Sequence, residues 1–205
     1  MTEIKAIIFD YGRVIGHFDH ARTAEKLVTY SRRPIDEIRG YLYPDELEDR
    51  FEKGAVSPDE FIAVLREELQ LECTPEEIRA AIADIFWHNQ QICELIPRLI
   101  PRYRLVLGSN TNVIHAEHFR VLSNPVLQHF YKLILSHEVK VRKPHREFFE
   151  HCVEATGQPA AACLFIDDLT ANIAGAKAAG LQTLLYSGQE TLIPELQALG
   201  VQLTS

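Results

Sequence analysis

The chain has 205 residues, enough for one medium-sized domain or for a core with an inserted subdomain. Hydrophobic residues make up 46% of it and charged residues 24%, which is typical of a globular protein with a buried core. The net charge of −8 leaves no basic surface for nucleic acid or for an anionic membrane. The four cysteines form no C-x-x-C pair, as is usual for reduced thiols. The sequence shows no signal-peptide pattern, and no apolar run approaches the ~20 residues that a membrane-spanning helix needs. We therefore expect a cytoplasmic protein.

Short apolar runs predict the strands of the core, the first of them over residues 5–9. Each run is nearly all apolar and is flanked by polar or turn-forming residues, as in strands buried on both faces of a parallel sheet. The later strands are predicted over 104–108, 132–136, 162–166 and 183–187, and helical spacing follows three of them, over 112–123, 145–157 and 170–180. This alternation predicts an α/β fold with a doubly wound, Rossmann-like parallel sheet.

Almost a hundred residues separate the first two strands and show no convincing strand pattern. Helical spacing runs over 20–31, 34–43, 57–70 and 74–90, the last helix ending at Trp87-His88-Asn89. Two of these helices begin with Ser or Thr, then Pro, then Glu at the third position, which is a strong N-terminal signal. We therefore expect an all-helical cap over residues 16–97, inserted into a core formed by 1–15 and 98–205 at the edge where open sheets bind ligands.

Four polar signals lie at or just beyond the ends of predicted strands. Each has an ordinary explanation on its own: a turn carboxylate, a helix cap or a solvated lysine. Together they bring a carboxylate nucleophile, a hydroxyl, a cation and an acidic pair to one sheet edge. The carboxylates would repel one another, and Mg2+, which prefers oxygen ligands and often binds phosphate, would resolve that conflict. The signals are Asp10, Ser109-Asn110, Lys143 and Asp167-Asp168, the last followed by Asn172.

These motifs, in this order, resemble those of the haloacid dehalogenase-like hydrolase superfamily. The segments are "FDYGRV", "GSNTN", "RKPHREFF" and "FIDDLTANIAGAKAAG". The similarity spans nearly the whole chain, and the helical insert lies where the superfamily carries its first type of cap. Within the superfamily the motifs are most similar to those of the bacterial α-D-glucose-1-phosphate phosphatase group.

The resemblance implies a Mg2+-dependent phosphatase for a small phosphorylated metabolite such as a sugar phosphate. We expect the protein to be a monomer or a homodimer. Asp10 would attack phosphorus and form an aspartyl-phosphate. Mg2+ would bind Asp10, the Gly12 carbonyl and Asp168, with Asp167 acting directly or through water. The remaining implied roles are phosphoryl binding by Ser109 and the Asn110 amide, charge neutralisation by Lys143, and orientation of Lys143 or the acidic pair by Asn172.

The sequence departs from the superfamily at Gly12, where most of its phosphatases carry the aspartate that protonates the leaving group. His17 is our candidate replacement, with Asp19 and His20 also near in sequence. Alternatively, an anomeric phosphate would need less protonation, or the protein would be a slow or inactive phosphate-binding relative. A 2-haloacid dehalogenase also lacks the second aspartate, and Arg13 could hold its substrate, but it would have no use for the pair Asp167-Asp168.

Overall fold

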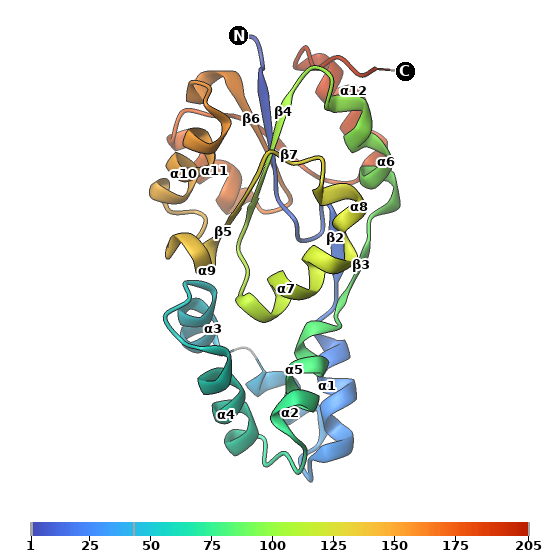
Figure 1. The fold of residues 1–205 in the computed structure, drawn as a ribbon, viewed down its shortest axis with the longest axis vertical. Helices are drawn as coiled ribbons and strands as arrows, with labels where there is room; N and C mark the ends of the chain where they lie inside the picture. Colours follow the sequence, from blue (N-terminus) through green and yellow to red (C-terminus); the bar gives the residue numbers. More distant parts are fainter. Residues whose placement is uncertain (1, 43, 205) are drawn as a thin grey trace.

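The computed structural model describes residues 2–42 and 44–204. A core and a helical cap lie at opposite ends of its long axis, and both chain termini lie at the core end (Figure 1). The core contains a five-stranded parallel sheet in the order β5-β4-β1-β6-β7. Its strands are β1 (Ala6–Phe9), β4 (Arg104–Ser109), β5 (Lys132–Leu135), β6 (Cys163–Asp167) and β7 (Gln182–Leu185). The five predicted strands are these five, which confirms the predicted fold class.

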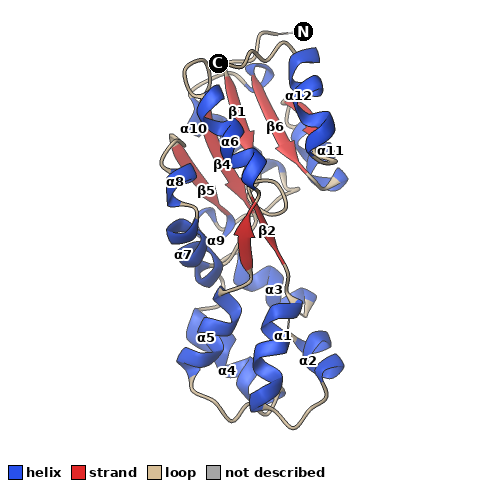
Figure 2. Ribbon diagram, turned by 90° about the vertical axis from the view of Figure 1, so that its right-hand side faces the viewer, coloured by secondary structure: helices blue, strands red, loops and turns tan. Residues whose placement is uncertain are grey.

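Helices cover both faces of the sheet, so its strands are apolar throughout (Figure 2). Ile7 and Phe9 of β1 pack against one layer of helices, and Ala6 and Ile8 pack against the other. The first layer contains α6 (Gln90–Leu99), α7 (Val113–Leu122), α8 (Asn124–Leu127) and α12 (Gln189–Ala198). The second contains α10 (Arg146–Thr156) and α11 (Thr170–Ala178), with the short elements α9 (Ser136–Val139) and η2 (Ala160–Ala162) nearby in the chain.

The cap has a hydrophobic core of its own, in which the rings of Phe51 and Phe61 stack at 4.2 Å. Both predicted N-terminal signals form complete capping boxes, at Ser57 with Glu60 and at Thr74 with Glu77. The cap elements are α1 (Ala21–Leu27), η1 (Val28–Tyr30), α2 (Ile35–Tyr41), α3 (Asp45–Glu52), α4 (Pro58–Glu68) and α5 (Pro75–Ala83). Among the described residues, every helix is too short or too polar to span a bilayer.

A small two-stranded antiparallel sheet connects the cap to the core, and here two expectations were wrong. Strands β2 (Gly16–Phe18) and β3 (Phe86–His88) pair within a segment expected to contain no strand. The helix predicted over 74–90 ends at Ala83, because the backbone leaves helical geometry at the next residue. In β3, buried Phe86 alternates with exposed Trp87, a period-two pattern that is too short to stand out in the sequence.

Three helices of eight or more residues, α3, α6 and α12, were not predicted from the sequence, and neither were the short helices α8 and α9. The end of the helix predicted over 34–43 lies outside the described residues at position 43. The division into a core (1–15 and 98–205) and a cap (16–97) stays a prediction, and the structure adds that α6 packs against the core. Of the three, α3 matters most for the site, because it is the cap helix that faces the carboxyl ends of the strands (Figure 1).

Candidate active site

Asp10 lies directly after β1, the central strand of the sheet. Its N–H donates to the Ile166 carbonyl at 2.9 Å, and its Oδ1 accepts the N–H of Tyr11 at 2.7 Å. The residue is 7% exposed. Burial, with a smaller contribution from the charge of Asp167, raises the pKa of the Asp10 carboxyl to about 7, although the Lys143 ammonium opposes this shift. An additional positive charge would therefore favour the ionised form that a nucleophile needs.

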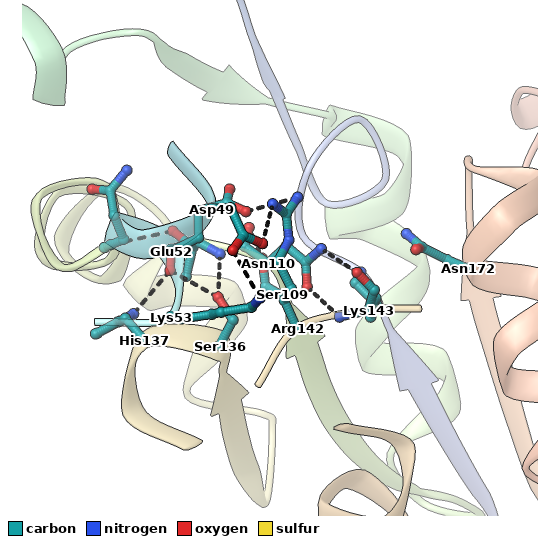
Figure 3. A network of polar contacts seen from close by, with 12 residues as sticks. Asp49, Glu52, Lys53, Ser109, Asn110, Ser136, His137, Arg142, Lys143 and Asn172 are labelled. Carbon is teal, nitrogen blue, oxygen red and sulfur yellow. Dashed lines mark hydrogen bonds and ion pairs between the residues drawn. The ribbon is translucent and has the colours of Figure 1, made fainter. Parts of the chain in front are cut away.

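Lys143 connects two of the carboxylates. Its Nζ lies 2.7 Å from Asp10 Oδ1 and 2.7 Å from Asp167 Oδ2, in a residue only 2% exposed. Burial alone would lower the pKa of Lys143, but the two carboxylates outweigh burial and raise it above its ordinary value. Asn110 clamps the lysine backbone, since its Oδ1 accepts the Lys143 N–H at 2.8 Å and its Nδ2 donates to the Lys143 carbonyl at 3.1 Å (Figure 3).

Asp167 is fully buried at the end of β6, and both of its carboxylate oxygens accept hydrogen bonds. Asn172 Nδ2 lies 3.0 Å from each oxygen, and the Leu169 N–H donates to Oδ1 at 2.8 Å. The predicted orienting residue Asn172 thus contacts the acidic pair directly. Asp168 is partly exposed, and burial together with Asp167 raises its pKa.

The three carboxylates converge as a candidate metal site. Asp10, Asp167 and Asp168 each place one oxygen within 4.8 Å of the others. The Lys143 ammonium pairs with only Asp10 and Asp167 of the three, and all three offer the hard oxygen donors that Mg2+ prefers. The donor set and its charge therefore fit a divalent cation.

Ser109 ends β4 and is 2% exposed. Its Oγ donates to the Asn110 carbonyl at 3.3 Å, a long bond that a better acceptor could replace. Ser109, Asn110 and Thr111 line a cavity that also reaches Gly12. The structure therefore brings all the predicted site residues except His17 to one edge of the sheet.

His17 lies elsewhere, on β2. Its ring faces Trp87 at 5.8 Å, and it lines a separate opening beside Arg13 and Asp168. Asp19 is exposed, and its Oδ1 accepts the N–H of Ala21, the first residue of α1, at 2.8 Å. Of the three replacements considered for the missing aspartate, only His20 lines the cavity.

The space next to Gly12 is filled by an aromatic ring. A β-carbon built on Gly12 would lie 2.9 Å from Phe18 Cε1, closer than real β-carbons pack. The ring is fixed from several sides, by the ring of His20 at 5.0 Å and by the Arg13 guanidinium at 5.7 Å. A side chain at position 12 therefore requires Phe18 to move.

This contact predicts coupling between the two positions. We expect Gly12→Asp to destabilise the protein by about 1–3 kcal/mol, because it overpacks against the Phe18 ring. In Phe18→Ala the same substitution should cost less, so urea unfolding of both single variants and the double variant should give a favourable coupling energy of about 1 kcal/mol or more. Additive effects would show that the ring does not occupy this space.

Glutamates of the cap also face the site, and sequence reasoning missed them. Glu48 and Glu52 of α3 line the same cavity as Gly12 and Ser109, which measures about 60 Å³. Arg142, the residue before Lys143, lies across from them with Nη2 2.9 Å from Glu52 Oε2 and Nη1 3.4 Å from Asp49 Oδ1 (Figure 3). The sequence does contain a signal for helix α3: Pro44 and the acidic residues after it are typical of a helix start, and Gly54 is typical of a helix end.

Comparison with known proteins identifies the family. The sequence model of the haloacid dehalogenase-like hydrolases matches residues 4–180. The chain therefore belongs to this family and is a hydrolase.

Individual relatives cover nearly the whole chain. It is 27% identical over 186 residues to D-ribitol-5-phosphate phosphatase of Bacteroides thetaiotaomicron, covering 88% of this chain and 90% of that one. It is 27% identical over 212 residues to a phosphatase of Mycobacterium tuberculosis, covering 96% and 95%. Among solved structures, a family enzyme of Bacteroides thetaiotaomicron in complex with magnesium and inorganic phosphate is similar at a TM-score of 0.78 and 28% identity, covering 91% of this chain and 96% of that one.

Proposed function

We propose that this hydrolase is a Mg2+-dependent phosphatase that acts on a small phosphate monoester through an aspartyl-phosphate on Asp10. One observation carries the proposal: the buried ammonium of Lys143 lies 2.7 Å from both Asp10 and Asp167. Asp168 places an oxygen close enough to these two carboxylates to share a metal ion with them. The three carboxylates together carry more negative charge than the one ammonium neutralises. A divalent cation would neutralise the remainder and could then bind a phosphate group.

Each side chain has a role that follows from its position. Asp10 would form the bond to phosphorus, and the Lys143 ammonium would neutralise a phosphoryl oxygen beside it. Ser109 Oγ and the Asn110 N–H would donate to the phosphoryl oxygens. Mg2+ would polarise the phosphoryl group and shield it from the carboxylates.

The hydrogen bonds distinguish the two aspartates of the acidic pair. Both oxygens of Asp167 already accept bonds from neighbouring groups, so we expect Asp167 to act on the metal through water. Asp168 is the more exposed of the two and would bind the metal directly, with Asp10 and the Gly12 carbonyl.

We further propose a phosphorylated sugar or polyol as the substrate. Support comes from the relative named for D-ribitol 5-phosphate and from the resemblance to the glucose-1-phosphate phosphatase group. The cavity of about 60 Å³ is smaller than the ~300–1,000 Å³ of most small-ligand sites, so substrate entry would require the cap to move away from the core. Dehalogenation is less well supported, because it gives Asp167 and Asp168 no task.

Metal dependence and substrate class can be tested together. Phosphate release should be measured from α-D-glucose 1-phosphate, D-ribitol 5-phosphate, glycerol 3-phosphate and p-nitrophenyl phosphate, each with Mg2+ and with a chelator. We expect release from at least one sugar or polyol ester, its loss in chelator and its recovery on addition of Mg2+. Mg2+ at 100 times its Kd should also stabilise the fold by about 2.7 kcal/mol.

The outcomes separate the candidate functions. Release that is unchanged in chelator would contradict the metal assignment. Halide release from 2-haloacids in chelator would instead support the dehalogenase.

A further inference from the structure

The mechanism above lacks a group that protonates the departing alcohol. The usual position is occupied by Gly12, and the adjoining space is filled by the ring of Phe18. An aromatic ring can neither give nor take a proton, so any proton donor must reach the leaving group from another direction. The cap side of the cavity is the direction from which the leaving group itself would be held.

We propose, on the basis of the phosphatase function proposed above, that Glu52 of the cap is the general acid and base of this enzyme. It lines the same cavity as Gly12 and Ser109, so its carboxyl group and the phosphate-binding edge of the sheet face a common space. It comes from α3, whose end packs over the core, which makes it available when the cap is closed (Figure 1).

Contacts with the core hold Glu52 at this place. Arg142 Nη2 lies 2.9 Å from its Oε2, and the Glu52 side chain is only 13% exposed. Arg142 directly precedes Lys143, so one loop positions both side chains (Figure 3). Its lysine pairs with the proposed nucleophile Asp10, and its arginine pairs with Glu52. Closure of the cap would thus place the acid in the cavity.

The protonation state suits this role. Burial raises the pKa of Glu52 to about 7 despite the neighbouring arginine, so the carboxyl can both give and accept a proton near neutral pH. Charged or titratable groups surround the Glu52 carboxyl on three sides. They are Arg142 and Lys143 of the core loop, Glu48 and Asp49 of its own helix, and His20 and His115 across the cavity.

The two histidines of the cavity are less suitable donors. Burial lowers the pKa of His20 to about 4 and that of His115 to about 3. Both rings are therefore neutral at neutral pH and hold no proton acidic enough to donate.

The proposed steps balance as follows. Asp10 bonds to phosphorus, the bond from phosphorus to the ester oxygen breaks, and the electron pair left on that oxygen takes the proton of Glu52. Water then gives a proton to the Glu52 carboxylate as its oxygen bonds to phosphorus, and the bond from phosphorus to Asp10 breaks. Glu52 and Asp10 return to their starting states, with alcohol and phosphate as products.

The test compares Glu52→Gln with Asp49→Asn, since both residues pair with Arg142 but only Glu52 lines the cavity. The readout is first-turnover alcohol release, measured by rapid quench for the best alkyl ester of the panel and for p-nitrophenyl phosphate. Glu52→Gln should slow the alkyl ester by about 10²–10⁴-fold, but p-nitrophenyl phosphate by less than about tenfold, because nitrophenolate departs without a proton. Asp49→Asn should change neither rate by more than about threefold.

The pH profile gives a second readout. Wild-type release from the alkyl ester should fall as the pH rises through about 7, where Glu52 loses its proton, and Glu52→Gln should lack this fall. The assignment would be overturned if Glu52→Gln slowed both esters equally or slowed neither of them. It would also be overturned if only Glu48→Gln slowed the alkyl ester selectively. None of these results would contradict the phosphatase function. A wild-type enzyme that releases no phosphate from any ester would instead contradict the function on which the assignment rests.

Discussion

Replacing Asp10 by Asn is expected to lower phosphate release by about 10⁴–10⁶-fold, the range seen when a covalent nucleophile is removed. The amide has nearly the same shape, and its oxygen can still accept the Tyr11 N–H that Asp10 Oδ1 accepts at 2.7 Å. Lys143 retains its contact with Asp167, so the fold should survive. Steady-state release from the best ester of the panel measures the effect, with circular dichroism to establish folding.

Asp19→Asn is the matched control for this prediction. Asp19 is also an aspartate close to β1 in the sequence, but it is exposed and accepts the first N–H of α1. An amide oxygen accepts such an N–H about as well as a carboxylate, so Asp19→Asn should release phosphate at the wild-type rate. Equal rates for the two variants would remove Asp10 from the reaction.

Lys143→Met should have the second largest effect, on both stability and rate. The substitution leaves Asp10 and the fully buried Asp167 without their shared ammonium, and stranding buried charge in this way usually costs about 3–5 kcal/mol. The phosphoryl group loses a preorganised cation as well, which should slow release by at least about 10²–10³-fold. Urea unfolding measures the first loss, and assays at a temperature where the variant is folded measure the second.

Lys177→Met is the matched control, because it makes the same chemical change at an exposed position near the end of α11, away from the carboxylates of the site. Its stability should stay within about 0.5 kcal/mol of the wild type and its rate should be unchanged. If Lys143→Met behaved like Lys177→Met, the buried ion pairs would be irrelevant to both fold and activity.

The core of the site could be predicted from the sequence because its residues follow strands that are easy to identify. Asp10, Ser109 and Asp167 each come at the end of an apolar run, and the carboxyl ends of parallel strands share one edge. The loop residue Lys143 was also placed correctly at this edge. Its backbone contacts with Asn110 were not foreseen, since they join residues 33 apart in the chain.

The cap side of the site could not be predicted in the same way. Only Leu47 and Phe51 are apolar in helix α3, and the other residues are charged, so the segment is too polar to indicate a buried helix. Its acidic residues look like a solvated surface until the fold brings Arg142 beside Glu52. His17 was chosen for its nearness to Gly12 in the sequence, but its ring lies beside Trp87 and lines an opening with Asp168 rather than the cavity that contains Gly12 and Ser109.

Gly12 shows how the two kinds of information combine. The sequence reveals the missing carboxylate, but only the structure shows that Phe18 takes the adjoining space. A histidine or aspartate nearby in the chain is then less suited to the task than a glutamate some forty residues away.

The covalent intermediate is the central claim, and rapid acid quench tests it most directly. Wild-type protein should be mixed with Mg2+ and an ester carrying a radiolabelled phosphoryl group, quenched during the first turnover and digested for peptide mapping. We predict that the label is bound covalently to the peptide containing Asp10 and that Asp10→Asn carries none. Release of labelled phosphate without labelled protein at any quench time, or label on another residue, would contradict the proposed mechanism.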